Sequence, residues 1–119
     1  MKKYNKVKGD EGEEIACDYL RKNCYKIICR NYKTYLGEID IIAVKDNCIH
    51  FIEVKLRNSR FYGGGVEAVN YYKRQHIEKV AKQYIALNEI VGMQIQFDVI
   101  EITKYKDKYY GKHYKQMLF

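Results

Sequence analysis

The chain has 119 residues and a mass of 14.2 kDa, a size that fits one domain with a single core. Hydrophobic residues make up 47% and charged residues 31%, which excludes a disordered chain, and no apolar run is long enough to span a membrane. The 22 Lys and Arg against 15 Asp and Glu give a formal net charge of +7, which favours a polyanionic partner such as nucleic acid. A lysine-rich surface that only keeps the protein in solution would account for the same charge.

The cysteines form no Cys-x-x-Cys pair, and each lies beside apolar residues, so we expect buried, reduced thiols. They are Cys17, Cys24, Cys29 and Cys48. The N-terminal residues are charged but lead into no apolar signal region. These observations predict a cytoplasmic protein, without disulfides or a cysteine-based zinc site.

A helix is predicted over residues 10–23, where apolar side chains recur at helical spacing. These apolar positions are Ile15, Ala16, Tyr19 and Leu20. Acidic residues at the start of this segment would face the positive end of the helix dipole. Glu13 shares the inward stripe, so we expect either a carboxylate with a partner in the core or one that reaches solvent at the edge of the stripe.

Three strands are predicted next, over residues 25–34, 38–44 and 48–56, because these runs are rich in β-branched and aromatic residues. The short polar break at residues 45–47 makes the second and third runs an antiparallel hairpin. The first strand is expected to pair alongside them as a meander.

Charged side chains interrupt the apolar pattern of the two hairpin strands. Glu53, Lys55 and Arg57 are two residues apart on the third strand and therefore point to one face. Asp40 stands among isoleucines on the second strand and can face them. The hairpin thus predicts one cluster of charged groups inside an otherwise apolar sheet.

Residues 58–65 contain Arg60 and three consecutive glycines, which predicts a flexible loop. It lacks the Gly-Lys-Ser or Gly-Lys-Thr ending of a phosphate-binding loop, so it is either a mobile margin of a site or a plain connection. A second helix over residues 66–88 and a fourth strand over residues 94–102 follow. Lysines and tyrosines dominate residues 104–119, a basic tail with room for a short last strand.

The element order α-β-β-β-α-β predicts a single α/β domain over residues 1–119, with a mixed sheet covered by helices on both faces. Lys73 lies on the inward stripe of the second helix, where it can reach a phosphate, neutralise an acid or extend to solvent. Asp98 on the fourth strand is expected to point outward, with a supporting role at the site as the alternative.

Two carboxylates inside an apolar sheet are costly unless they are paired or bound to a metal. The hard oxygen ligands of Asp40 and Glu53 select Mg²⁺ or Mn²⁺, and Glu13 could supply a third ligand. Lys55 beside such a cation could orient or deprotonate an attacking water. The planar fork of Arg57 is suited to hold a phosphate.

The alternative for the same residues is structural. Lys55 would pair with Asp40 or Glu53 as a buried ion pair, and Arg57 would form a salt bridge at the rim. The spacing of these residues alone leaves both alternatives open.

An Asp followed about a dozen residues later by Glu-x-Lys, after a helix with an inward Glu, resembles the PD-(D/E)xK superfamily of restriction-endonuclease-like folds. The blocks Gly37-Glu38-Ile39-Asp40 and Glu53-Val54-Lys55-Leu56-Arg57 resemble more closely the YraN family of small bacterial proteins, a likeness that covers residues 8–102. Archaeal Holliday-junction resolvases are similar by fold. Two departures from the YraN pattern are Gln96, where a basic residue is usual, and Gly63-Gly64-Gly65, where a proline is common.

The resemblance implies a nuclease that uses Mg²⁺ or Mn²⁺ and hydrolyses phosphodiesters, on DNA that is branched or otherwise structured. Its catalytic residues would be Glu13, Asp40, Glu53 and Lys55, the three acids being the metal ligands. Arg57, Arg60 and Lys73 would contact the nucleic acid, and a homodimer would suit a four-way junction. The alternatives are a non-catalytic nucleic-acid-binding or complex-forming module, and a purely structural domain.

Overall fold

A computed structural model describes residues 2–58 and 71–115, and describes side chains over residues 11–57 and 73–115. In chain order the elements are α1 (Lys2–Lys22), β1 (Lys26–Thr34), β2 (Gly37–Lys45), β3 (Cys48–Asn58), α2 (Tyr71–Leu87), β4 (Gln94–Tyr105) and β5 (Lys108–Tyr114). Arg60, the three consecutive glycines and the predicted start of the second helix lie outside the described residues.

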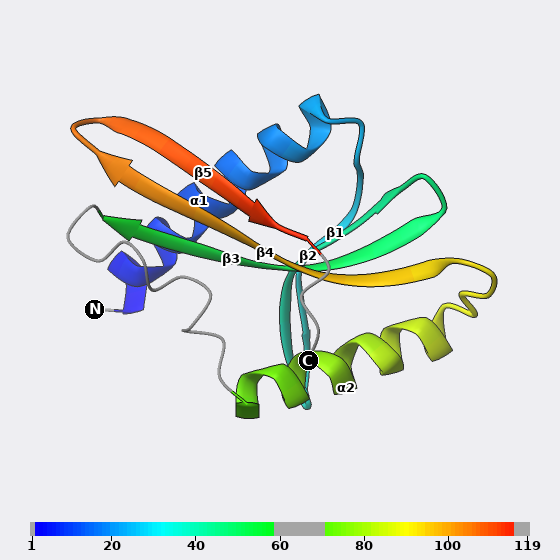
Figure 1. Ribbon diagram of the computed structural model, residues 1–119. Coiled ribbons are helices and arrows are strands. Elements are labelled where there is room, and N and C mark those ends of the chain that lie inside the picture. Colours follow the sequence, from blue (N-terminus) through cyan, green and yellow to red (C-terminus); the bar gives the residue numbers. More distant parts are fainter. Residues whose placement is uncertain (1, 59–70, 116–119) are drawn as a thin grey trace.

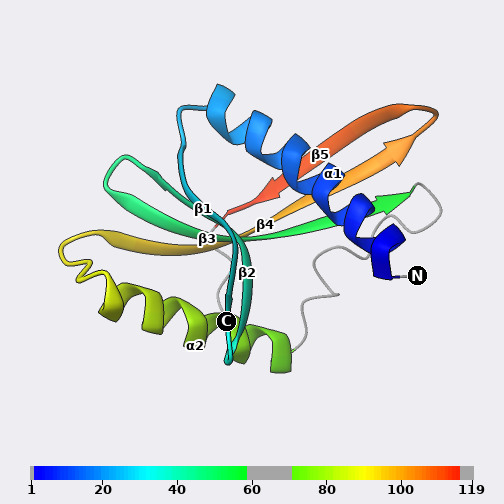
Figure 2. The same ribbon diagram turned by 180° about the vertical axis from the view of Figure 1, so that it is seen from behind.

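The five strands form one sheet in the order β1-β2-β3-β4-β5. Strands β3 and β4 are parallel and are connected through α2, while the other neighbouring pairs are antiparallel. Helix α1 crosses one face of the sheet and α2 crosses the other (Figures 1 and 2). The predicted mixed α/β sheet with helices on both faces is confirmed, and β5 realises the short last strand of the basic tail.

Each helix covers its own hydrophobic cluster. The cluster against α1 contains Ala16, Cys17, Leu20, Ile41, Ala43, Ile52, Ile100 and Ile102. The cluster against α2 contains Ile39, Ile42, Ile49, Phe51, Ile77, Val80, Ala81 and Tyr84. Because side chains alternate along a strand, the continuous apolar runs of the sequence supply both clusters at once.

Helix α1 begins at Lys2, well before the predicted start at residue 10, so the acidic residues lie within the helix and not in its first turn. The expectation that these acids face the positive end of the helix dipole is therefore wrong. A glycine inside a helix costs about 1 kcal/mol relative to alanine, yet Gly12 has a packing reason. A Cβ at this position would lie 3.1 Å from Leu56 Cβ, so Gly12 lets α1 approach β3 closely.

Two further expectations are corrected. Cys24 is exposed, at the positive-φ position that follows α1, although all four cysteines are free thiols as predicted. Asp98 does not point outward: its residue is only 1% exposed and its side chain lies in the α1 half of the molecule. Over the described residues, neither helix is long and apolar enough to cross a membrane.

Candidate active site

Asp40 lies where β2 changes the face that its side chains present. Ile39 packs in the cluster against α2 and Ile41 in the cluster against α1, although residues two apart on a regular strand share a face. The ladder between β2 and β3 begins at the pair Ile41 and Ile52, so Asp40 stands just beyond its end. There Asp40 Oδ2 accepts a 2.8 Å hydrogen bond from the Val54 backbone N–H. A side-chain carboxylate thus takes the place of a backbone acceptor.

The environment of Asp40 disfavours its charge. Burial, and next the neighbouring Glu53 carboxylate, raise the pKa of Asp40 from 3.8 to about 7, while the hydrogen bond from Val54 acts in the opposite direction. Glu13 adds a smaller increase in the same pKa. Within the described ranges Asp40 makes no ion pair. A nearby positive charge would therefore favour the ionised form of this carboxylate.

Glu53 is buried and carries two lysine contacts on one oxygen. Lys73 Nζ lies 2.6 Å from Glu53 Oε1, and Lys55 Nζ lies 3.6 Å from the same atom. The sequence predicted that Lys55 could pair with this acid, and left open whether Lys73 would neutralise a site acid. Both contacts are present, so the ion-pair alternative describes Glu53 correctly but leaves Asp40 unexplained.

The pKa values of the two lysines shift in opposite directions. Burial, a hydrogen bond with Lys73 and the charge of Lys73 lower the pKa of the Lys55 amine. Burial also lowers the pKa of Lys73, but its hydrogen bonds to Glu53 and Lys55 outweigh this effect and raise it overall. Lys55 is thus the amine that more readily exists in the neutral, proton-accepting form, and Lys73 is the one that stays charged.

Glu13 faces the sheet from α1, as its place on the inward stripe predicted. Its residue is 7% exposed, and Arg30 Nη2 lies 3.9 Å from Glu13 Oε1. Arg30 Nη1 also donates a 2.8 Å hydrogen bond to Glu14 Oε2. Arg30 therefore ties β1 to α1 beside the site, a role that the sequence did not assign to it.

Glu101 is a member of the cluster that sequence reasoning missed. It is only 5% exposed and pairs in register with Lys55 across the parallel strands β3 and β4. Its Oε2 atom lies 3.7 Å from Arg57 Nε, which places the guanidinium of Arg57 at the same face. The signal was available, because Glu101 interrupts an apolar run as Asp40 does, but the pairing that places it beside Lys55 is not local.

The structure brings Asp40, Glu53, Lys55 and Lys73 into one cluster, with Glu13 approaching from α1. Asp98 does not join this cluster, because it lies on the other face of β4 with His50 and His113. Arg60 falls outside the described residues. The predicted catalytic residues and the predicted phosphate ligands Arg57 and Lys73 therefore lie around one site, and Asp98, for which a supporting role was the alternative, does not.

The residues fit a divalent cation through their donor chemistry. Over residues 11–57 and 73–115, no three His, Cys, Asp or Glu side chains are gathered into a ready metal site. Mg²⁺, however, commonly takes only one or two carboxylates and completes its shell with water and substrate oxygens. Asp40 and Glu53 supply two such groups, and the positive charge of a cation would oppose the effects of burial and of Glu53, which raise the pKa of Asp40. In the present arrangement Lys73 holds the Glu53 oxygen that such a cation would share.

The chain is similar to other proteins over most of its length. The model of a family described as "Uncharacterised protein family UPF0102" matches residues 12–102. A "UPF0102 protein" of Alkaliphilus metalliredigens is 46% identical over 104 residues, which cover 87% of this chain and 91% of that protein. Relatives with the same description in Clostridium acetobutylicum and Caldanaerobacter subterraneus are 47% and 48% identical, each over 86% of this chain and 84% of the relative.

Proposed function

Since the chain belongs to the uncharacterised protein family UPF0102, we propose its function from the chemistry of the site: it binds nucleic acid, and hydrolyses phosphodiester bonds of DNA with Mg²⁺ or Mn²⁺. The observation that carries the proposal is the carboxylate of Asp40, half-buried beside Glu53 and without an ion pair in the described part of the chain. A purely structural cluster would be expected to neutralise both acids. Among the described residues, Glu53 forms ion pairs with two lysines and Asp40 forms none.

Asp40 and Glu53 would hold the cation, with Glu13 close enough to influence the pKa of Asp40. When bound, the cation would polarise the phosphate and stabilise charge on its oxygens. Lys55 accepts a proton from the attacking water as the new bond to phosphorus forms. The bond from phosphorus to the leaving sugar oxygen breaks, and that oxygen gains a proton from solvent. The lowered pKa of Lys55 suits it to this proton transfer.

The basic residues of the cluster bind the substrate backbone. Arg57 presents a planar donor group at the face of Glu53 and is oriented by Glu101. Lys73 is partly exposed and keeps its charge, so it exchanges its contact with Glu53 for a substrate phosphate when a cation occupies the carboxylates. Binding that depends on these phosphate contacts weakens as salt concentration rises.

The test is cleavage of branched, flapped, single-stranded and duplex DNA, and of RNA, in buffer that contains Mg²⁺ or Mn²⁺. Glu53→Gln and Lys55→Met are compared with wild type, and Glu78→Gln serves as the matched control, because Glu78 pairs with Lys82 on the outer part of α2. Loss of a proton acceptor such as Lys55 is expected to lower the rate by about 10²–10⁴-fold. Glu78→Gln should cleave like wild type.

Equal cleavage by wild type and both site variants would refute the mechanism and point to a contaminating nuclease. Salt-dependent binding without cleavage of any substrate would favour the alternative, a nucleic-acid-binding module that keeps the fold but does not catalyse. Absence of binding under every condition would exclude both.

A further inference from the structure

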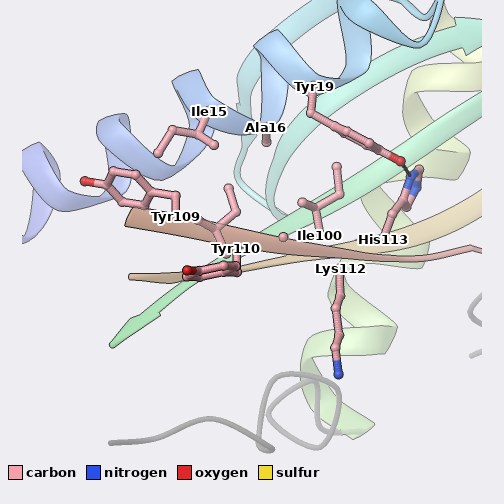
Figure 3. A pocket seen from close by; sticks show the side chains of 10 residues that line it. Ile15, Ala16, Tyr19, Ile100, Tyr109, Tyr110, Lys112 and His113 are labelled. Atoms are coloured by element: carbon pink, nitrogen blue, oxygen red, sulfur yellow. Dashed lines mark hydrogen bonds between the residues drawn. The ribbon is translucent and has the colours of Figure 1, made fainter. Parts of the chain in front are cut away.

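A pocket of about 260 Å³ lies between α1 and the β4–β5 hairpin, and its lining residues do not include those of the proposed active site (Figure 3). Ile15 and Tyr19 line it from α1, and Ile100 and Ile102 from β4. Pockets for drug-sized ligands measure about 300–1,000 Å³, so this volume restricts an occupant to one or two rings.

The pocket exists because β5 carries a glycine at its centre. Gly111 pairs with Ile102, whose side chain packs against α1, so a side chain on Gly111 would enter the same space. Among the described residues, a Cβ at Gly111 would meet one atom within 4 Å, the Glu101 carbonyl oxygen at 3.9 Å, and the backbone there is not in the positive-φ region. Neither a steric nor a conformational need for glycine is present, and the missing side chain leaves the space open.

One end of the pocket is polar and connected to buried groups. The Tyr19 hydroxyl lies 2.8 Å from His113 Nδ1, and His113 Nε2 lies 2.8 Å from Asp98 Oδ2. His50 Nδ1 contacts the same Asp98 oxygen at 2.9 Å. A carboxylate only accepts hydrogen bonds, so His113 donates through Nε2 and, in the neutral form, accepts through Nδ1. Tyr19 therefore donates its proton to His113, and its oxygen keeps a lone pair for another donor.

Two further lining residues direct their polar groups away from the pocket. Tyr109 lines one side of the pocket, and its hydroxyl donates a hydrogen bond to Glu11. Lys112 lines the pocket, yet its side chain extends away to the other face of the hairpin (Figure 3), opposite Glu101 in the ladder. A charged ligand would leave its charge uncompensated among isoleucine side chains, which is unfavourable. Flat rings, by contrast, can pack against the isoleucines and the tyrosine rings.

We propose that this pocket binds a small, uncharged, planar aromatic molecule that donates one hydrogen bond to the Tyr19 hydroxyl oxygen. Ile15, Ile100 and Ile102 provide its apolar contacts. The site is separate from the carboxylate cluster and does not depend on the nuclease proposal. It adds a ligand-binding site between α1 and the β4–β5 hairpin.

The test uses indole as the probe. The chain has no tryptophan, so the fluorescence of indole can be observed above that of the protein. Titration of the protein into indole is expected to give a saturable blue shift and a rise in anisotropy. N-methylindole, which lacks the N–H donor, should bind more weakly by about two- to tenfold, the range expected for one hydrogen bond.

Two variants separate the pocket from other binding. Gly111→Val fills the space and should abolish saturable binding, while Glu78→Gln, on α2 at the other face of the sheet, should leave it unchanged. Tyr19→Phe keeps the ring and should remove the difference between indole and N-methylindole. Circular dichroism checks that each variant folds, and Ile15→Phe fills the pocket from α1 if Gly111→Val does not fold.

No saturable shift with wild type would overturn the proposal, and so would undiminished binding to a folded, filled variant. Equal affinity for indole and N-methylindole would overturn the assignment of a donor to the ligand.

Discussion

Two aspartates of the sheet, the buried Asp98 and the half-buried Asp40, have opposite surroundings. Asp98 receives hydrogen bonds from His50 and His113, and despite its burial these contacts lower its pKa to about 2. Burial, and next the charge of Glu53, raise the pKa of Asp40 to about 7, although one backbone hydrogen bond acts in the opposite direction. One acid is stabilised in its charged form by the fold, and the other is destabilised.

This difference distinguishes an acid with a structural role from an acid that is a candidate for a functional role. A satisfied carboxylate fixes its neighbours, as Asp98 does by connecting β3, β4 and β5 through two histidines. A carboxylate whose charged form is disfavoured by the surrounding protein is a candidate to bind a positively charged ligand. Both aspartates interrupt apolar runs in the sequence, so only their contacts distinguish them.

The largest expected effect comes from removing the satisfied acid. Asp98→Ala leaves His50 and His113 without their acceptor and should lower the free energy of unfolding by about 3–5 kcal/mol. Urea unfolding at pH 7 measures it, with Asp18→Ala on the exposed side of α1 as the control. A loss for Asp98→Ala no larger than that of the control would contradict the structural role.

The stability that Asp98 contributes to the wild-type chain should depend on pH. The pKa of Asp98 is lower in the folded chain than the ordinary 3.8, so its stabilising contribution is complete above pH 4. As the pH falls from about 4 toward 2 the unfolded chain binds the proton first, and this contribution is lost. Asp98→Ala should therefore lack that part of the acid dependence.

The under-satisfied acid should behave in the opposite way. Between pH 3.8 and about 7 the unfolded chain has released the Asp40 proton while the folded chain still holds it, so stability falls as the pH rises. Asp40→Asn retains an acceptor for the Val54 N–H and carries no charge. At pH 8 without divalent cations it should be more stable than wild type by about 2–4 kcal/mol. Equal stability at pH 8, measured by urea unfolding, would show that Asp40 is not strained.

A divalent cation should relieve Asp40 and leave Asp98 unaffected. At a Mn²⁺ concentration ten times its Kd, wild type should gain about 1.4 kcal/mol of stability. Asp40→Asn should lose this gain, whereas Glu38→Gln should keep it, because Glu38 is an exposed acid that pairs with Lys33 on the same hairpin. Calorimetric scans with Mn²⁺ and with chelator measure the gain. Equal stabilisation of wild type and Asp40→Asn would place the cation elsewhere.

The smallest expected effect concerns the lysine pair. Lys73→Met removes both the hydrogen bond and the positive charge that help to lower the pKa of Lys55. The pKa of Lys55 should therefore rise toward its ordinary value, as followed by NMR of the lysine side chains. Lys82→Met, which removes a lysine from the exposed side of α2, is the control. A Lys55 pKa that does not change in Lys73→Met would show that burial alone lowers it.

Much of the architecture was predictable because its signals are local. The polar turn at residues 45–47 indicated the hairpin, and both Asp46 and Asn47 have the positive φ that such turns need. The two-residue period placed Glu53, Lys55 and Arg57 on one face, and the contacts of these side chains agree. The resemblance to the YraN family is confirmed by the match of the chain to UPF0102.

The sequence by itself thus determined the strands, the hairpins, the family and the identity of the charged residues, because each depends on neighbours a few positions apart. The tertiary structure alone decided which acids are satisfied. Asp98 meets His113 only because β5 folds back onto β4, and Asp40 meets Glu53 only because β2 changes face at the end of its ladder. The pKa of a buried group depends on such non-local partners, so two aspartates with similar sequence surroundings acquire opposite roles.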